Sequence, residues 1–232
     1  MKKLSRRLKN KNKKMVNLIT QYHPHSPIIE QYRLIRNNLH FSSVDHDIKT
    51  IVITSPEPSD GKSTTSANLA IVLSQHGKRV LLVDADLRKP SVHYTFNLSN
   101  KDGLTSVLTK DISLEKAICK TYLPNLDILT SGPIPPNPSE LLDSKTMELL
   151  IEELKLAYEY IIFDTPPILV VTDSQNLASK CDGVVMVVSS GKTKKDRAMK
   201  AKDLLEKANS IMVGIVVNGV ESTQGKYYGY YG

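Results

Sequence analysis

Tryptophan is absent from the 232-residue chain, and cysteine occurs only at Cys119 and Cys181. These two cysteines are far apart and have neither metal-binding nor redox spacing, which predicts a reducing, cytosolic compartment without a disulfide framework. The chain also lacks an apolar run approaching the roughly 20 residues that a bilayer span needs. No apolar segment follows the charged N-terminus, so we expect no secretory signal.

Positive charge is concentrated at one end of the chain. The net charge is +7, and residues 1–14 contain eight lysines and arginines but no acidic residue. Without these eight charges the rest of the chain has a net charge of −1. We therefore expect residues 1–25 to form a basic, flexible segment. A solvated tail and a segment attracted to anionic lipid are equally consistent with this charge. Because the body offers no further basic patch or aromatic platform, we expect no nucleic-acid partner.

The remaining sequence alternates between apolar strand patterns and helical patterns. Apolar residues make up 40% of the chain, which is enough for a sizeable core. Such alternation predicts an α/β domain over residues 26–220, with a mostly parallel central sheet and helices on both faces. The sequence Gly-Lys-Ser at residues 61–63 makes the predicted fold P-loop NTPase-like. The expected strands lie near 50–53, 79–84, 126–129, 160–163, 182–188 and 211–218, and the expected helices near 26–41, 64–73, 103–108, 114–118, 139 onward, 174–180 and 193–209.

A Gly-Lys-Ser loop lies between the first predicted strand and the helix that follows it. Strand, loop and helix in this order form the context of a phosphate-binding P-loop, whose backbone N–H groups and helix N-terminus face the phosphates. The usual first glycine of the motif is replaced by Ser55. We expect the loop to bind nucleotide through Ser59, Asp60, Gly61, Lys62, Ser63 and Thr64.

Three aspartates follow buried strands. Asp84 and Asp86 end the strand near 79–84, and Asp164 ends the strand near 160–163. Carboxyl ends of parallel strands meet at one edge of a sheet, so these side chains are expected to share a metal-phosphate site. Ser63, Asp84 and Asp164 are the predicted Mg²⁺ ligands. Asn218 ends the last strand, where it could contact the nucleotide base or simply form a turn.

Two further segments have unusual composition. Glu30, Arg33 and Arg36 lie three residues apart on the predicted helix 26–41, where spacing alone favours a solvated face over a subunit interface. Four of the ten tyrosines lie within residues 225–232. This glycine-spaced end could dock on a partner, or it could present phosphate acceptors on a mobile tail. The four tyrosines are Tyr227, Tyr228, Tyr230 and Tyr231.

From about residue 26 to the C-terminus, the chain resembles the bacterial P-loop tyrosine kinases (BY-kinases) found with capsular or exopolysaccharide operons. The resemblance rests on Walker A at 55–63, Walker A′ at 81–88 and Walker B at 161–167, together with the Glu-x-x-Arg-x-x-Arg helix and the tyrosine-rich tail over 221–232. That family tolerates a start such as Ser55. Cell-division and partition ATPases instead carry a signature lysine, which would fall at Glu57, and they lack the tyrosine tail.

The resemblance implies a cytoplasmic kinase module that uses ATP and Mg²⁺ and is recruited to the inner face of the cell membrane by the cytoplasmic tail of a transmembrane activator protein. It implies a ring-shaped homo-oligomer with Glu30, Arg33 and Arg36 at the subunit contacts, which reverses the expectation from spacing alone. It further implies protein tyrosine substrates, a phosphotyrosine phosphatase, and a role in polysaccharide synthesis or export.

We expect Lys62, Asp84, Asp86 and Arg88 to be the catalytic residues, and the tail tyrosines to be phosphorylated in trans. Asp86 or Asp84 would accept the tyrosine proton. Arg88 could stabilise transition-state charge or only pair with a carboxylate. Two alternatives are a partition-type or positioning ATPase that acts as a switch, and a non-catalytic assembly module.

Overall fold

The computed structural model describes residues 18–22, 26–42 and 47–220. Seven strands in these ranges form one sheet with the order β3-β4-β2-β5-β1-β6-β7. All neighbouring pairs are parallel except β3 with β4. The strands are β1 (Thr50–Thr54), β2 (Val80–Asp84), β3 (Ile118–Lys120), β4 (Leu126–Leu129), β5 (Tyr160–Asp164), β6 (Gly183–Ser189) and β7 (Met212–Asn218).

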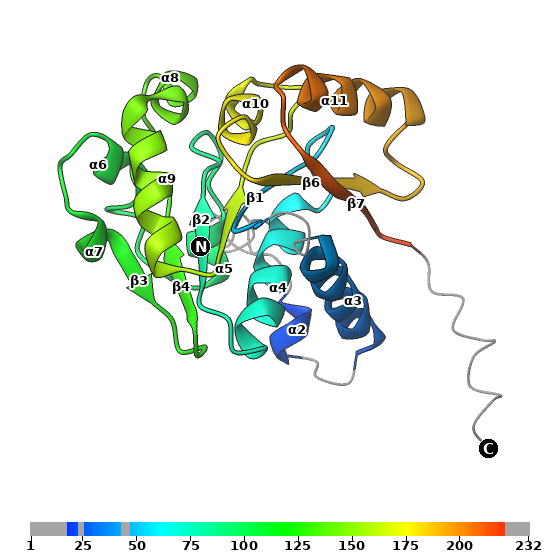
Figure 1. The fold of residues 1–232 in the computed structure, drawn as a ribbon, viewed down its shortest axis with the longest axis horizontal. Helices are drawn as coiled ribbons and strands as arrows, with labels where there is room; N and C mark the ends of the chain where they lie inside the picture. Colours follow the sequence, from blue (N-terminus) through cyan, green and yellow to red (C-terminus); the bar gives the residue numbers. More distant parts are fainter. Residues whose placement is uncertain (1–17, 23–25, 43–46, 221–232) are drawn as a thin grey trace, which may run out of the picture.

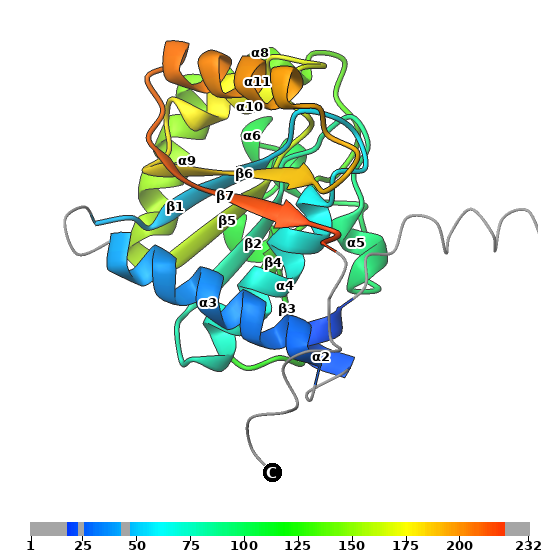
Figure 2. The same cartoon turned by 90° about the vertical axis from the view of Figure 1, so that its right-hand side faces the viewer.

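Helices cover both faces of the sheet, which is the predicted three-layer α/β architecture (Figure 1, Figure 2). On one face lie α2 (Ile19–Tyr22), α3 (Pro27–Ser42), α4 (Lys62–Gln75) and α5 (Val92–Thr95). On the other lie α6 (Leu104–Leu108), α7 (Leu114–Ala117), α8 (Pro138–Asp143), α9 (Lys145–Ala157), α10 (Asp173–Ala178) and α11 (Lys195–Lys207).

The central strands are buried on both faces. Every residue of β1, β2 and β5 is buried, which explains why these segments read as continuous apolar runs rather than alternating patterns. One apolar cluster fills the space between the sheet and α4, and a second lies beneath α6 to α11. Burial on both faces fixes the strands that carry the polar groups at their carboxyl ends.

Helix α4 is buried over most of its length, from Lys62 to Ser74. It packs against β1, β2 and β5, so its N-terminus is held at the carboxyl ends of those strands. The preceding Gly61 has φ 104°, a left-handed conformation that favours glycine. The turn from strand into helix therefore depends on this glycine.

Two short elements of the body differ from the expectation. Ile118 was expected to end a helix, but α7 ends at Ala117, and Ile118–Lys120 pairs antiparallel with β4. Periodicity cannot identify such a short edge strand, because three residues contain no repeat. Helix α5 was likewise not predicted, since it is only one turn long.

Part of the N-terminal segment expected to be flexible is packed against the body. Leu18 and Thr20 are each 3% exposed. The backbone N–H and hydroxyl of Thr20 donate to Asn68 Oδ1 of α4 at 3.1 and 2.9 Å. A contact far away in sequence therefore places this short stretch against the body, and the boundary at residue 25 stays a prediction. The basic residues 1–14 lie outside the described residues.

None of the helices in the described ranges is long and apolar enough to cross a membrane.

Asp182 joins the amino ends of β1 and β6. Its Oδ2 accepts hydrogen bonds from the backbone N–H groups of Lys49 and Thr50 and from the Thr50 hydroxyl, at 2.8 to 3.0 Å. Lys155 Nζ lies 2.9 Å from the other oxygen. Burial raises the pKa of Asp182, but these hydrogen bonds outweigh that effect and place the pKa below its ordinary value.

We predict that Asp182→Ala lowers the free energy of unfolding by about 1–3 kcal/mol at neutral pH, since three donors lose their charged acceptor. A carboxyl whose pKa is lowered on folding contributes its full stabilisation at pH values above its pKa in the unfolded chain, about 3.9. That stabilisation is lost as the pH falls through the pKa in the folded protein. The difference in free energy of unfolding between wild type and variant, measured by urea unfolding, should therefore shrink below about pH 4. An equal difference at every pH would contradict this role.

Candidate active site

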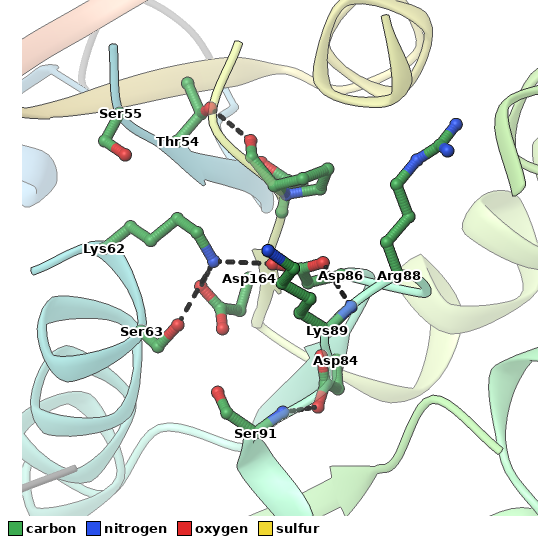
Figure 3. Close-up of polar contacts among 12 residues, drawn as sticks. Thr54, Ser55, Lys62, Ser63, Asp84, Asp86, Arg88, Lys89, Ser91 and Asp164 are labelled. Atoms are coloured by element: carbon green, nitrogen blue, oxygen red, sulfur yellow. Dashed lines mark hydrogen bonds and ion pairs between the residues drawn. The ribbon is translucent and has the colours of Figure 1, made fainter. Parts of the chain in front are cut away.

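The predicted site residues gather where β1, β2 and β5 end. Asp84 and Asp164 are register partners on the adjacent strands β2 and β5. Lys62 opens α4, directly after the loop that leaves β1. Figure 3 shows Lys62, Asp84, Asp86 and Asp164 around one centre. The expectation that carboxylates from separate strands share one sheet edge with the Gly-Lys-Ser loop is therefore met by the geometry.

Internal hydrogen bonds shape the P-loop. Ser59 has φ 66° and Gly61 has φ 104°, two left-handed residues of the kind that turn successive N–H groups toward an anion. Asp60 is fully buried, and its Oδ2 accepts from the backbone N–H of Glu57 at 2.9 Å. The Asp60 side chain therefore holds the loop rather than facing a ligand.

Ser55 replaces the usual first glycine without opening the loop. It is fully buried, its hydroxyl donates to the Glu57 carbonyl at 2.8 Å, and its own carbonyl accepts from Ile168 N–H at 2.9 Å. The hydroxyl thus supplies a hydrogen bond across the loop that glycine could not make.

Asn218 contacts the P-loop from the end of β7. Its Nδ2 donates to the Asp60 carbonyl at 3.0 Å. A Cβ on Gly61 would lie 2.0 Å from the same nitrogen, so a larger residue there would displace the Asn218 amide from the loop. The sequence left open a contact with the nucleotide base or a turn for Asn218, and the structure instead places its amide on the loop backbone.

Lys62 is the cation at the centre of the site. Its Nζ lies 2.9 Å from Asp86 Oδ2, 3.8 Å from Asp164 Oδ1 and 3.3 Å from the Ser63 hydroxyl. Burial alone would lower the pKa of Lys62, but Asp164 and Asp86 raise it above its ordinary value. Lys62 therefore stays charged in a site from which water is largely excluded.

Asp84 and Asp164 each have one carboxylate oxygen without a hydrogen-bond partner among the described residues, Asp84 Oδ1 and Asp164 Oδ2. The second oxygen of Asp84 accepts from the N–H groups of Ser91 and Val92, and that of Asp164 accepts from the Ser66 hydroxyl. A buried carboxylate oxygen without a partner is costly unless a cation or a donor joins it.

The donor set fits Mg²⁺. No group of three or more His, Cys, Asp or Glu side chains that could hold a metal was found within residues 18–22, 26–42 and 47–220. Two carboxylates and the Ser63 hydroxyl instead match an ion that keeps waters and takes further oxygens from substrate phosphates. Ser63, Asp84 and Asp164 are therefore the residues that would hold it. Thr64 follows in the first turn of α4.

Arg88 points away from the central cluster in Figure 3. Its guanidinium forms a two-pronged ion pair with the fully buried Asp173, at 2.9 and 3.0 Å. Of the two roles considered for Arg88, the geometry matches pairing with a carboxylate. Asp86 uses its second oxygen to accept from Lys89 N–H at 3.0 Å, which fixes it beside Lys62.

Asp173 and Ser66 contact predicted site residues but were not themselves predicted. Asp173 opens α10, and a helix-starting aspartate is so common that it gave no signal. Ser66 lies one turn into α4, inside an ordinary helical pattern. Only the packing of strands and helices reveals that their side chains reach Arg88 and Asp164.

A further predicted region lies on another helix. Glu30, Arg33 and Arg36 are on α3, where Arg33 pairs with Glu30 at 2.5 Å and Arg36 donates to the Asn37 side chain. Tyr227, Tyr228, Tyr230 and Tyr231 lie outside the described residues.

The acidic cluster should reduce the stability of the nucleotide-free protein. Burial, followed by the neighbouring Asp164, raises the pKa of Asp84 from 3.8 to about 8. Between these values the folded state holds a proton that the unfolded state has released, so stability falls as the pH rises. We predict that Asp84→Asn raises the free energy of unfolding by at least about 1 kcal/mol near pH 8, and by less near pH 5. Thermal melts with a chelator and without nucleotide would measure this. A variant less stable than wild type near pH 8 would refute it.

Comparison with known proteins agrees with this geometry. Residues 48–212 match the family model described as an AAA domain. The chain is 53% identical over 225 residues to the tyrosine-protein kinase YwqD of Bacillus subtilis (strain 168), covering 97% of this chain and 95% of that protein. It is 41% identical over 210 residues to the putative tyrosine-protein kinase CapB of Staphylococcus aureus, covering 90% and 92%.

Solved structures show the same fold. The chimerical protein CapA2B2 has a TM-score of 0.85 at 43% identity, covering 90% of this chain and 93% of that one. The kinase domain of the Escherichia coli tyrosine kinase ETK has a TM-score of 0.84 at 30% identity, covering 90% and 84%. The septum site-determining protein MinD of Pyrococcus horikoshii, complexed with Mg-ADP, has a TM-score of 0.63 at 26% identity, covering 73% and 70%. With a P-loop and strand-end aspartates on a seven-stranded sheet, and with these relatives along nearly its whole length, the chain belongs to the P-loop family of bacterial tyrosine-protein kinases.

Proposed function

We propose that this chain is an ATP-dependent kinase that autophosphorylates its C-terminal tyrosines in trans and thereby regulates polysaccharide synthesis or export. The observation that carries the proposal is the position of Lys62, which lies between Asp86 and Asp164 beside two carboxylate oxygens without partners. A cation and unsatisfied anions on one P-loop fit a site for a metal-bound triphosphate.

ATP is the proposed donor. The loop from Ser59 to Thr64 would contact its phosphates through backbone N–H groups, with Lys62 exchanging carboxylate contacts for phosphate oxygens. Mg²⁺ on Ser63, Asp84 and Asp164 would neutralise charge on the phosphates.

The reaction is transfer of the γ-phosphoryl group to a tyrosine hydroxyl. The bond between phosphorus and the tyrosine oxygen forms while the bond to the β-phosphate bridging oxygen breaks, leaving ADP. Tyrosine has an ordinary pKa near 10, so little phenolate exists at neutral pH. Asp86, held by Lys62 and Lys89 N–H, or Asp84 would accept the proton. Charge neutralisation and positioning contribute most of the rate gain.

The acceptors are Tyr227, Tyr228, Tyr230 and Tyr231 of a neighbouring subunit in a ring. Helix α3 would provide subunit contacts through Glu30, Arg33 and Arg36. Three large apolar side chains of α3 are also exposed, Ile28, Leu34 and Phe41, at 46%, 53% and 68%. Exposed apolar groups among paired charges are typical of a surface that another protein covers. Each added phosphate brings about −1.5 to −2 charges, which would loosen the ring.

The proposal includes recruitment to the inner face of the membrane by the cytoplasmic tail of a transmembrane activator, and reversal by a phosphotyrosine phosphatase. One structural relative is the chimerical protein CapA2B2, with 43% identity to this chain. The basic residues 1–14 would add attraction to anionic lipid.

A positioning ATPase that acts as a switch is the second candidate, because the MinD fold aligns with 73% of this chain. At the position of the partition ATPases' signature lysine this chain carries Glu57, which pairs with Arg197 at 3.0 Å. The opposite charge at this position favours the kinase. A non-catalytic assembly module would leave the cation and acidic cluster without a purpose.

We predict that Lys62→Met lowers tail phosphorylation by at least about 100-fold, since it removes the charge that positions the phosphates. Phosphotyrosine mass spectrometry after incubation with ATP and Mg²⁺, with and without a candidate activator segment, would measure it. Equal phosphorylation of wild type and variant would refute the kinase. ATP hydrolysis with an unmodified tail would favour the switch.

We also predict that Arg33→Glu combined with Arg36→Glu shifts the oligomer toward monomer, because it places like charges beside Glu30. Sedimentation velocity would measure the change. Lys116→Glu is the matched control, since Lys116 is exposed on α7 across the sheet. An unchanged oligomer in the double variant would exclude α3 from the interface.

A further inference from the structure

The outer half of the P-loop, Glu57 to Asp60, is contacted by a part of the chain more than 130 residues away. Two cations from the turn after β6 and from α11 reach it, Lys192 and Arg197. We infer that Lys192 and Arg197 are positioning residues that hold the loop in its phosphate-binding conformation and so set its affinity for ATP. This inference rests on the proposed function for the identity of the ligand.

Lys192 neutralises the buried carboxylate inside the loop. Its Nζ donates to the Pro58 carbonyl at 2.8 Å and lies 3.3 Å from Asp60 Oδ1. Asp60 is fully buried and uses its other oxygen to fix Glu57 N–H. Within the described ranges, Lys192 is the only cation in ion-pair distance of Asp60. A buried carboxylate that loses its cation is strongly destabilised, so the loop would have to rearrange without Lys192.

Arg197 holds the tip of the loop from α11. Its Nε lies 3.0 Å from Glu57 Oε1, and the two side chains are 38% and 32% exposed. Glu57 is thus tied both through its backbone N–H by Asp60 and through its side chain by Arg197. The pair is half-buried, so its contribution is modest but specific to charge.

The loop needs such support because its conformation is strained. Ser59 has φ 66°, a left-handed value for a residue other than glycine. Conformations of this kind persist only when the surroundings impose them. Small displacements of phosphate-positioning groups have large effects on binding and catalysis.

The supporting elements are themselves joined. Ser190 N–H donates to the Asn218 carbonyl, and Ser189 N–H donates to the Thr193 hydroxyl, both at 2.8 Å. Asn218 in turn donates to Asp60. Helix α11 buries Ala201 and Leu205 against the core, and its ion pair between Arg197 and Glu57 ties it to the loop. The turn after β6, α11 and the end of β7 therefore act as one brace on the P-loop.

A charge-reversal cycle tests the brace. We expect Arg197→Glu and Glu57→Arg each to weaken binding of a fluorescent ATP analogue with Mg²⁺ roughly fivefold, the value of a half-exposed ion pair. The double variant restores the pair in reverse and should return to within about twofold of wild type. Lys200→Glu is the matched control, an exposed lysine on the same helix. We expect it to bind like wild type.

A second set of variants avoids dependence on the reversed pair. Lys192→Met should raise the KM for ATP roughly tenfold with a smaller change in kcat, the pattern of lost ground-state binding, and Lys192→Arg should recover most of it. Thermal melts verify that each variant is folded.

The inference is overturned if Arg197→Glu and Lys192→Met bind the analogue like Lys200→Glu, or if the double variant binds no better than the single ones. Failure of the proposed function is distinguishable, because binding is measured without phosphorylation. If the wild type binds ATP but leaves its tail unmodified, the proposed kinase reaction is refuted, whereas the binding data still test the role of Lys192 and Arg197.

Discussion

The balance of buried charge around Lys62 is the constraint on which the rest of the site depends. Asp84 and Asp164 end adjacent parallel strands, and Asp86 follows two residues later, so the sheet itself brings like charges together. Lys62 Nζ offsets part of that repulsion at 2.9 Å from Asp86 and 3.8 Å from Asp164. Two carboxylate oxygens remain without a partner. Such an arrangement lowers stability in order to bind a metal-phosphate ligand, as functional sites commonly do.

The cation can hold this position only because the P-loop is fixed from several sides. Ser55 bonds across the loop, Asp60 fills its interior, and Asn218 fits against Gly61. Lys192, from the turn after β6, pairs with Asp60, and Arg197, from α11, pairs with Glu57. The loop at residues 54–61 is local in sequence, but its shape is determined by the last two strands and the last helix of the described chain.

The central strands could be predicted from the sequence because they are buried on both faces and form continuous apolar runs, such as Ile51–Ile53 and Ile161–Phe163. Lys62, Asp84 and Asp164 were identified because strand ends in a parallel sheet converge. The strand Ile118–Lys120 and helix Val92–Thr95 were missed because three or four residues carry no period. Leu18 and Thr20 were missed because Asn68, their anchor, is distant in sequence.

By itself, then, the sequence determined which of the longer elements form, which side chains end the central strands, and to which family of P-loop proteins the chain belongs. Those features follow from local apolar patterns and from motifs that are contiguous in the chain. The tertiary structure decided the partners of the charged groups: Arg88 with Asp173, Asn218 with the loop backbone, and Glu57 with Arg197. Each of these contacts joins segments 85 or more residues apart. No local pattern encodes such a pairing, because it depends on how the strands are ordered in the sheet.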